Sequence, residues 1–178
     1  FGSFADYQLK DAWTWEHQAL VRARAIAGDP AVVRRFEEIR KKVLSTPREP
    51  ENLKASVRDM RHRIRKEHAD TSSDEFDLKQ SPGGMVDIEF LVQYMALLKA
   101  SEFPEIIRWT DVVRILFTLY KTGIMDHETV HILREAYLTY RAMAHRLNLQ
   151  EKSARVGGDR FRWLRKKVAG IYDRCLDG

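Results

Sequence analysis

A run of apolar residues behind a glycine pair dominates the middle of the sequence: SPGGMVDIEFLVQYMALL, residues 81–98. From Met85 to Leu98, the length and the even hydrophobicity of this run are typical of a helix that is buried on most sides. We therefore expect this helix inside the fold, with the neighbouring helices of the chain packed around it.

Apolar residues at helical spacing, separated by glycine and proline, make up most of the remaining chain. Asp29, Asp111 (with Thr110) and Asp126 stand where helix caps are expected, and Pro30 suits a first helical turn. The nine glycines and five prolines are few, which is typical of an all-helical protein. The expected helices begin near residues 4, 30, 50, 85, 111, 126 and 160, and the first and the last run to about residues 27 and 176.

These segments predict an all-α fold, a single compact bundle of about six or seven helices over residues 1–178. Two stretches depart from it: polar residues 70–75 read as a loop, and residues 76–79 as briefly extended. The chain opens with Phe1 rather than Met, so we expect it to be part of a longer protein.

Composition restricts the class of protein, with 44% apolar and 32% charged residues, as in soluble globular domains. Cys175 is the one cysteine, so no internal disulfide is possible, which fits a reducing compartment such as the cytoplasm; we expect it to be a packing residue. No apolar run approaches the roughly 18 residues of a membrane span. The net charge of +5 favours anionic partners in general without singling out nucleic acid.

The most unusual segment is FDLKQSPGGMVDIEF, residues 76–90. Two glycines ahead of a helix, Gly83 and Gly84, let the backbone approach a ligand closely, and free N–H groups there favour anions. Lys79 adds a positive charge just upstream, although the glycine spacing is not that of a P-loop. The alternative is that the two glycines only allow tight packing at the start of the helix.

Asp87 and Glu89 are charges in an otherwise apolar helix, and buried carboxylates need partners. Two residues correspond to about 200° around a helix, so the two side chains cannot share one site. This geometry argues against a metal or acid/base pair. We favour a structural role, in which each carboxylate holds an arginine of a neighbouring helix.

The first predicted helix carries two tryptophans, Trp13 and Trp15, and aromatic residues this close usually indicate core packing. Its polar residues have a second interpretation, because arginine suits phosphate or carboxylate ligands. The pocket that this interpretation predicts is lined by Glu16, His17, Arg22 and Arg24.

Basic residues crowd the helix that begins near residue 50, beside its apolar stripe of Leu53, Val57, Met60 and Ile64. They form either a solvated face or an anion-facing surface, and they are Arg58, Arg61, His62, Arg65 and Lys66. Metal binding is not expected, since only His127 and His131 share a helix face at close spacing.

Two segments resemble one known family. AWTWEHQALVRAR (residues 12–24) is similar to the segment after the second nucleotidyltransferase domain of bacterial glutamine synthetase adenylyltransferases. FDLK (76–79), Gly83-Gly84 and DIEF (87–90) resemble the second signature of that family, and RWTD (108–111) fits its C-terminal end. The likeness covers nearly the whole chain and points to the C-terminal, adenylylating half.

This resemblance implies a parent enzyme that moves AMP from ATP to a tyrosine of glutamine synthetase, under control of glutamine and the PII signalling protein. Its chemistry belongs to a polymerase-beta-like domain whose carboxylates hold Mg²⁺ around ATP. The Gly-Ser and Asp-x-Asp motifs of that domain do not occur at the start of this chain. We therefore expect no catalytic residue, metal site or cofactor here, and no transfer by this chain alone.

The resemblance implies that this chain is a helical accessory domain beside the catalytic cleft. The expected ligand or interdomain contacts are Glu16, His17, Arg22, Arg24, Lys79, Gly83, Gly84, Asp87 and Glu89. The expected partners are the nucleotidyltransferase domain, glutamine synthetase and PII. One alternative is a pure docking module for PII or glutamine synthetase. Another is a basic nucleic-acid-binding domain, although no helix-turn-helix signature is present.

Overall fold

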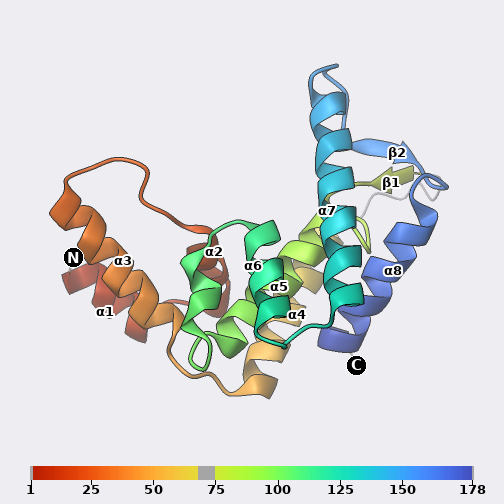
Figure 1. Ribbon diagram of the computed structural model, residues 1–178. Coiled ribbons are helices and arrows are strands. Elements are labelled where there is room, and N and C mark those ends of the chain that lie inside the picture. Colours follow the sequence, from red (N-terminus) through yellow and green to blue (C-terminus); the bar gives the residue numbers. More distant parts are fainter. Residues whose placement is uncertain (1, 68–74, 178) are drawn as a thin grey trace.

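The computed structural model describes residues 2–67 and 75–177, and within these ranges the chain is all-α apart from one small ribbon (Figure 1). Its α-helices are α1 (Gly2–Lys10), α2 (Thr14–Arg22), α3 (Pro30–Leu44), α4 (Pro50–Glu67), α5 (Met85–Lys99), α6 (Val112–Lys121), α7 (His127–Asn148) and α8 (Arg162–Tyr172). A 3-10 helix (Pro104–Arg108) and a π-helical turn (Asp173–Asp177) complete the helical elements, and the all-α prediction is confirmed.

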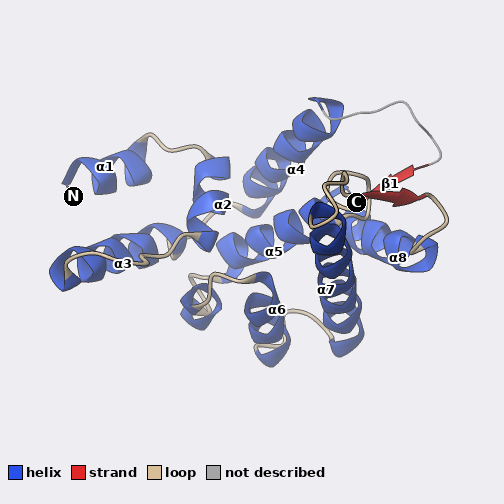
Figure 2. Cartoon of the chain, turned by 90° about the horizontal axis from the view of Figure 1, so that it is seen from above, coloured by secondary structure: helices blue, strands red, loops and turns tan. Residues whose placement is uncertain are grey.

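Helix α5 is the centre of the fold. It packs against α2, α4, α6, α7 and α8, and Figure 2 shows it between them. Its buried residues lie on nearly every side, as its largely apolar sequence predicts: Met85, Asp87, Ile88, Leu91, Val92, Gln93, Tyr94, Ala96 and Leu97. These five helices are therefore positioned by what they present to α5.

The predicted first helix is two helices, which brings the number of α-helices among the described residues to eight. Helix α1 ends where Tyr7 O accepts hydrogen bonds from the N–H groups of both Asp11 and Ala12. A new N-terminus then forms at Trp13, whose N–H donates to Glu16 Oε2 at 2.8 Å. Such a reciprocal bond from the third residue of a helix stabilises its first turn.

The tryptophans of this junction are exposed, so the prediction that they pack in the core is wrong. Trp13 is 69% and Trp15 47% exposed. The break between α1 and α2 turns the chain just before them, and the core contacts of α2 are made instead by Gln18, Leu20 and Val21.

The predicted helix caps are confirmed. Asp29 Oδ1 accepts from Ala31 N at 2.7 Å, Asp111 from Arg114 N at 2.9 Å and Asp126 from Thr129 N at 2.8 Å. These acceptors satisfy N–H groups that have no partner inside the helix. Gly123 follows α6 with a φ of 73°, the left-handed conformation that ends many helices.

The extended stretch predicted at 76–79 is strand β1 (Glu75–Asp77), which pairs antiparallel with β2 (Arg155–Gly157), Phe76 opposite Val156. Strand β2 was not predicted, because residues 157–159 read only as a separator between helices. Phe76 is fully buried and meets Tyr140 edge-on, with ring centroids 5.3 Å apart. The ribbon thus attaches to α7. Residues 70–74 of the predicted polar loop lie outside the described residues.

The side chain of Arg40 ties three segments together from inside the fold. Its guanidinium donates to Leu20 O at 3.0 Å, Val21 O at 2.7 Å and Ile107 O at 2.8 Å. Leu20 and Val21 are at the C-terminal end of α2, where a cation also suits the negative end of the helix dipole. No helix in the described part of the chain is both long and apolar enough to cross a membrane.

Replacing Arg40 by Met keeps the volume of the side chain but leaves three carbonyl oxygens without their donor. We expect the free energy of unfolding to fall by about 3 kcal/mol, measured by urea denaturation. The control is Arg35→Met on the same helix, where the guanidinium is exposed and pairs only with Glu38. That variant is expected to lie within about 0.5 kcal/mol of the unmodified chain; equal losses in both variants would contradict the role given to Arg40.

Candidate functional site

Asp87 is completely buried in the first turn of α5, and three donors surround its carboxylate. Arg61 Nε reaches Oδ1 at 2.7 Å, while an amino group of Arg65 and the N–H of Gly83 reach Oδ2, each at 2.7 Å. Both arginines come from α4. The prediction that this carboxylate holds arginine from a neighbouring helix is confirmed, with two arginines in place of one.

The basic face of α4 is only partly a solvated face, since Arg61 is as buried as Asp87. The remaining donors of its guanidinium bind Gln80, at 2.7 Å to the backbone oxygen and 3.2 Å to Oε1. Arg65 lies over the ring of Tyr172 at 4.9 Å. The anion that these two arginines meet is a carboxylate of the chain itself.

The glycine pair is explained by close packing. A Cβ on Gly83 would lie 2.3 Å from the backbone oxygen of Arg165, and one on Gly84 would lie 2.8 Å from two backbone oxygens. Gly83 also has a φ of 79°, which favours glycine. Their N–H groups donate to Asp87 and to Ser81 O. The alternative of a tightly packed helix start therefore accounts for these N–H groups, which are not free for a ligand.

Glu89 faces the other side of α5, as its position about 200° from Asp87 requires. Its Oε1 lies 2.7 Å from an amino nitrogen of Arg22 on α2 and accepts a hydrogen bond of 3.1 Å from Tyr137 on α7. Unlike Asp87, this cluster reaches the surface, with 42% of the Arg22 side chain and 23% of the Glu89 side chain exposed. We call Arg22, Glu89 and Tyr137 the surface triad.

His17 and Glu16 form hydrogen bonds at the junction between α1 and α2. His17 Nε2 lies 2.9 Å from Gln8 O and therefore donates, which leaves Nδ1 to accept from Arg48 at 3.4 Å. Burial and the Arg48 charge lower the pKa of His17. Glu16 accepts from the Tyr7 hydroxyl at 2.6 Å, and this hydrogen bond, followed by that from Trp13 N, lowers its pKa.

The structure thus separates the residues that the sequence grouped in one polar pocket. Glu16 and His17 contact α1 and the segment before α4, whereas Arg22 joins the surface triad. Arg24 is exposed beyond the end of α2, without an ion pair among the described residues. Lys79 is exposed in the turn before α5 and lines a cavity beside α7.

Two features of the site were not found from the sequence. Arg48 is a further, partly buried arginine, which donates to Leu44 O, Val43 O and Leu97 O. Polar residues of α7 line the same cavity as Lys79, and their helical spacing is the signal that could have revealed them: Arg141, His145 and Asn148 are three or four residues apart.

The described residues contain no group of three His, Cys, Asp or Glu side chains that could hold a metal ion. His127 and His131 are neighbours on α7, with ring centroids 6.0 Å apart, but no third ligand joins them in these ranges. Cys175 is half-buried against the core, and burial raises the pKa of its thiol.

Asp87→Asn leaves the buried guanidinium of Arg61 and the partly buried guanidinium of Arg65 without a counter-charge. We expect it to lower the free energy of unfolding by about 3 kcal/mol, measured in urea. Glu89→Gln is the matched control, since it makes the same chemical change in the same helix at a partly exposed site, and we expect it to lose less than about 1 kcal/mol. Similar losses from both would show that Asp87 does not organise the core.

His17 makes stability depend on pH in a defined direction. Its pKa in the folded state lies below the usual value of 6.5, so the unfolded state binds the proton more tightly. Stability from this residue is complete above pH 6.5 and falls as the pH drops through that value towards the folded pKa. Thermal unfolding at pH 7.5 and 5.5 tests this, and His17→Gln is expected to reduce the difference.

Two family models match the chain. The model described as GlnD PII-uridylyltransferase matches residues 51–157, which run from α4 to the end of β2 and include the Asp87 cluster. The model described as glutamate-ammonia ligase adenylyltransferase (GlnE) matches residues 1–39, which include α1, α2 and Arg22. Because the first match covers more than half of the sequence, the chain belongs to the GlnD PII-uridylyltransferase family, as a helical domain of the kind found in glutamate-ammonia ligase adenylyltransferase.

Proposed function

We propose that this chain is the helical accessory domain of an enzyme that transfers AMP from ATP to a tyrosine of glutamine synthetase, in the adenylylating half of that enzyme. Both matched families are nucleotidyltransferases by description, which supports a parent of this chemistry. The domain works in the cytoplasm beside the nucleotidyltransferase domain that carries out the transfer.

The observation that carries this proposal is the meeting of the two signature segments. Residues 12–24 and 76–90 are far apart in sequence, yet Arg22 and Glu89 form an ion pair of 2.7 Å. One turn away on each helix, Gln18 donates to Gln93 at 3.2 Å in the interior. Packing inside the domain does not require the charges of Arg22 and Glu89 at the surface. The exposed part of Arg22 remains available to another domain.

Arginine suits this contact because its planar guanidinium binds one carboxylate on one edge and leaves further N–H donors for a second anion. In the surface triad Glu89 takes one amino group of Arg22 and fixes the direction of the side chain. The Arg22 side chain is 42% exposed. The domain therefore presents a preorganised cation to its neighbour, an arrangement that positions substrates with little loss of side-chain entropy.

In this proposal Mg²⁺ and the α-phosphate of ATP, where the transfer takes place, belong to the catalytic domain. Asp87 and Glu89, the carboxylates of the second signature, do not fit a magnesium site, because arginines already occupy both and they face opposite sides of α5. This chain alone is therefore expected to leave glutamine synthetase unlabelled.

An exposed aromatic pair supports a second candidate function, a docking module for glutamine synthetase or PII. Trp13 and Trp15 line a cavity of about 440 Å³ together with Asp59, Met60 and Arg63. Tryptophan is enriched at the centres of protein interfaces. The nucleic-acid alternative has less support, since two of the basic residues of α4 that motivated it, Arg61 and Arg65, bind Asp87.

The test is adenylylation of purified glutamine synthetase by the full-length enzyme, with labelled ATP and Mg²⁺. We expect Arg22→Ala to lower kcat/KM on the order of tenfold to a hundredfold, because a displaced positioning group costs rates of that size. Arg35→Ala, which breaks an exposed ion pair of α3, is the matched control and leaves the rate unchanged.

A charge swap separates a positioning role from a purely structural one. Arg22→Glu combined with Glu89→Arg restores the ion pair but moves the cation to another helix, so we expect no recovery of activity. Full recovery would show that Arg22 only holds α2 to α5 and would overturn the proposal. In the docking alternative, Trp13→Ala raises KM for glutamine synthetase while KM for ATP stays unchanged.

A further inference from the structure

A cavity of about 760 Å³ lies between α7, the turn before α5 and the segment that leads from α7 to β2. The charged side chains in its lining are all basic. Lys79, Arg141, His145 and Lys152 contribute to it, and no Asp or Glu lines it. The side chains come from three separate parts of the chain, so their convergence is a result of the fold.

The cations of this cavity are not paired within the described residues. No ion pair or side-chain hydrogen bond joins Lys79, Arg141 or Lys152 to a carboxylate there. Gathering like charges in a concave, partly apolar site raises the positive potential in it. An anion bound in the cavity would relieve this repulsion.

The floor of the cavity is apolar. Met85, Leu138 and Ala142 line it, and Leu138 is 38% exposed. Ligand pockets typically enclose about 300–1,000 Å³ and combine an apolar surface with a few converging polar groups. A volume of about 760 Å³ therefore suits a molecule larger than a single phosphate ion, with one charged and one flat apolar part.

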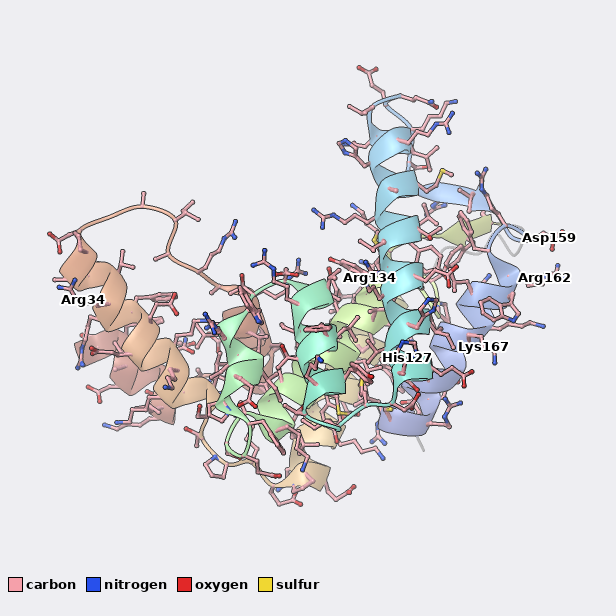
Figure 3. All side chains as sticks on the ribbon, viewed as in Figure 1. Arg34, His127, Arg134, Asp159, Arg162 and Lys167 are labelled. Atoms are coloured by element: carbon pink, nitrogen blue, oxygen red, sulfur yellow. The ribbon has the colours of Figure 1, made fainter. Side chains whose placement is uncertain are left out.

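The second basic groove of the molecule is less suited to binding anions. It has a volume of about 870 Å³ and is lined by Arg160, Arg162, Arg165 and Lys166 near the start of α8. Here two of the three guanidiniums are already engaged: Arg162 pairs with Asp159, and Arg165 donates to Pro82 O at 3.1 Å. Figure 3 shows Asp159 and Arg162 together at the outer edge of α8. This groove provides a control for general charge effects.

The cavity is close to the surface triad, because Arg141 follows Tyr137 by one helical turn on α7. We propose that it binds the pyrophosphate unit of a nucleoside triphosphate, an inference that rests on the proposed function. Arg141 binds two phosphate oxygens, Lys79 and Lys152 neutralise further charge, and the base lies over Leu138. Free pyrophosphate, released by adenylyl transfer, has the same chemistry.

Titration calorimetry on the 178-residue chain with ATP, pyrophosphate and inorganic phosphate tests this inference. We expect ATP and pyrophosphate to bind more tightly than phosphate, and their affinity to fall as salt is added. Arg141→Ala and Lys79→Ala are each expected to weaken binding about tenfold, the usual effect of one charged hydrogen bond. Arg160→Ala and Lys166→Ala remove the same charge from the α8 groove and leave affinity within about twofold.

Three results would overturn the inference: no binding of ATP or pyrophosphate, equal losses from the α7 and α8 variants, or an oligonucleotide that binds more tightly than ATP and depends on Arg141. Tighter binding of ATP than of pyrophosphate assigns the cavity to the whole nucleotide, and equal binding assigns it to the released product. Since the proposed function is tested through Arg22 and Glu89, either idea can fail while the other holds.

Discussion

The carboxylate of Asp87 is removed from water in the middle of the molecule, and the helices around it are placed by the groups that neutralise it. An unpaired charge in such a position is several kcal/mol unfavourable, so the fold depends on its donors being present. Arg61 and Arg65 are one turn apart on α4, and together they fix both the separation and the rotation of that helix against α5. The N-terminal end of the α5 dipole adds to the stabilisation.

The turn before α5 also packs against α8, and this packing affects the direction of the side chains on the opposite side of α5. Gly83 donates to Asp87 while the backbone oxygen of Arg165 lies against its Cα, a closeness that any side chain would prevent. With α5 held from behind by α4 and α8, Glu89 is directed towards α2 and α7. One signature segment thus combines an internal anchor with a charge at the surface, which explains why its two carboxylates are so close in sequence yet differ in exposure.

Local features of the structure were predictable from the sequence and non-local ones were not. The Asp29 cap and the burial of α5 follow from neighbouring residues alone. The burial of Arg61 does not, since an arginine on an amphipathic helix is ordinarily solvated and its partner lies 26 residues away. Strand β2 owes its existence to distant β1. The exposure of Trp13 depends on a helix break without a glycine or proline to mark it.

The pairing of β1 with β2 also bears on the order in which the chain folds. Phe76 and Val156 are partners across about 80 residues, and closing a loop of that length costs roughly 4 kcal/mol of entropy. A ribbon of three residues in each strand has few hydrogen bonds to offset this. Burial of Phe76 against Tyr140 supplies about 3 kcal/mol or more, but only after α7 has docked on α5. We therefore expect the ribbon to form late, after the helices have assembled.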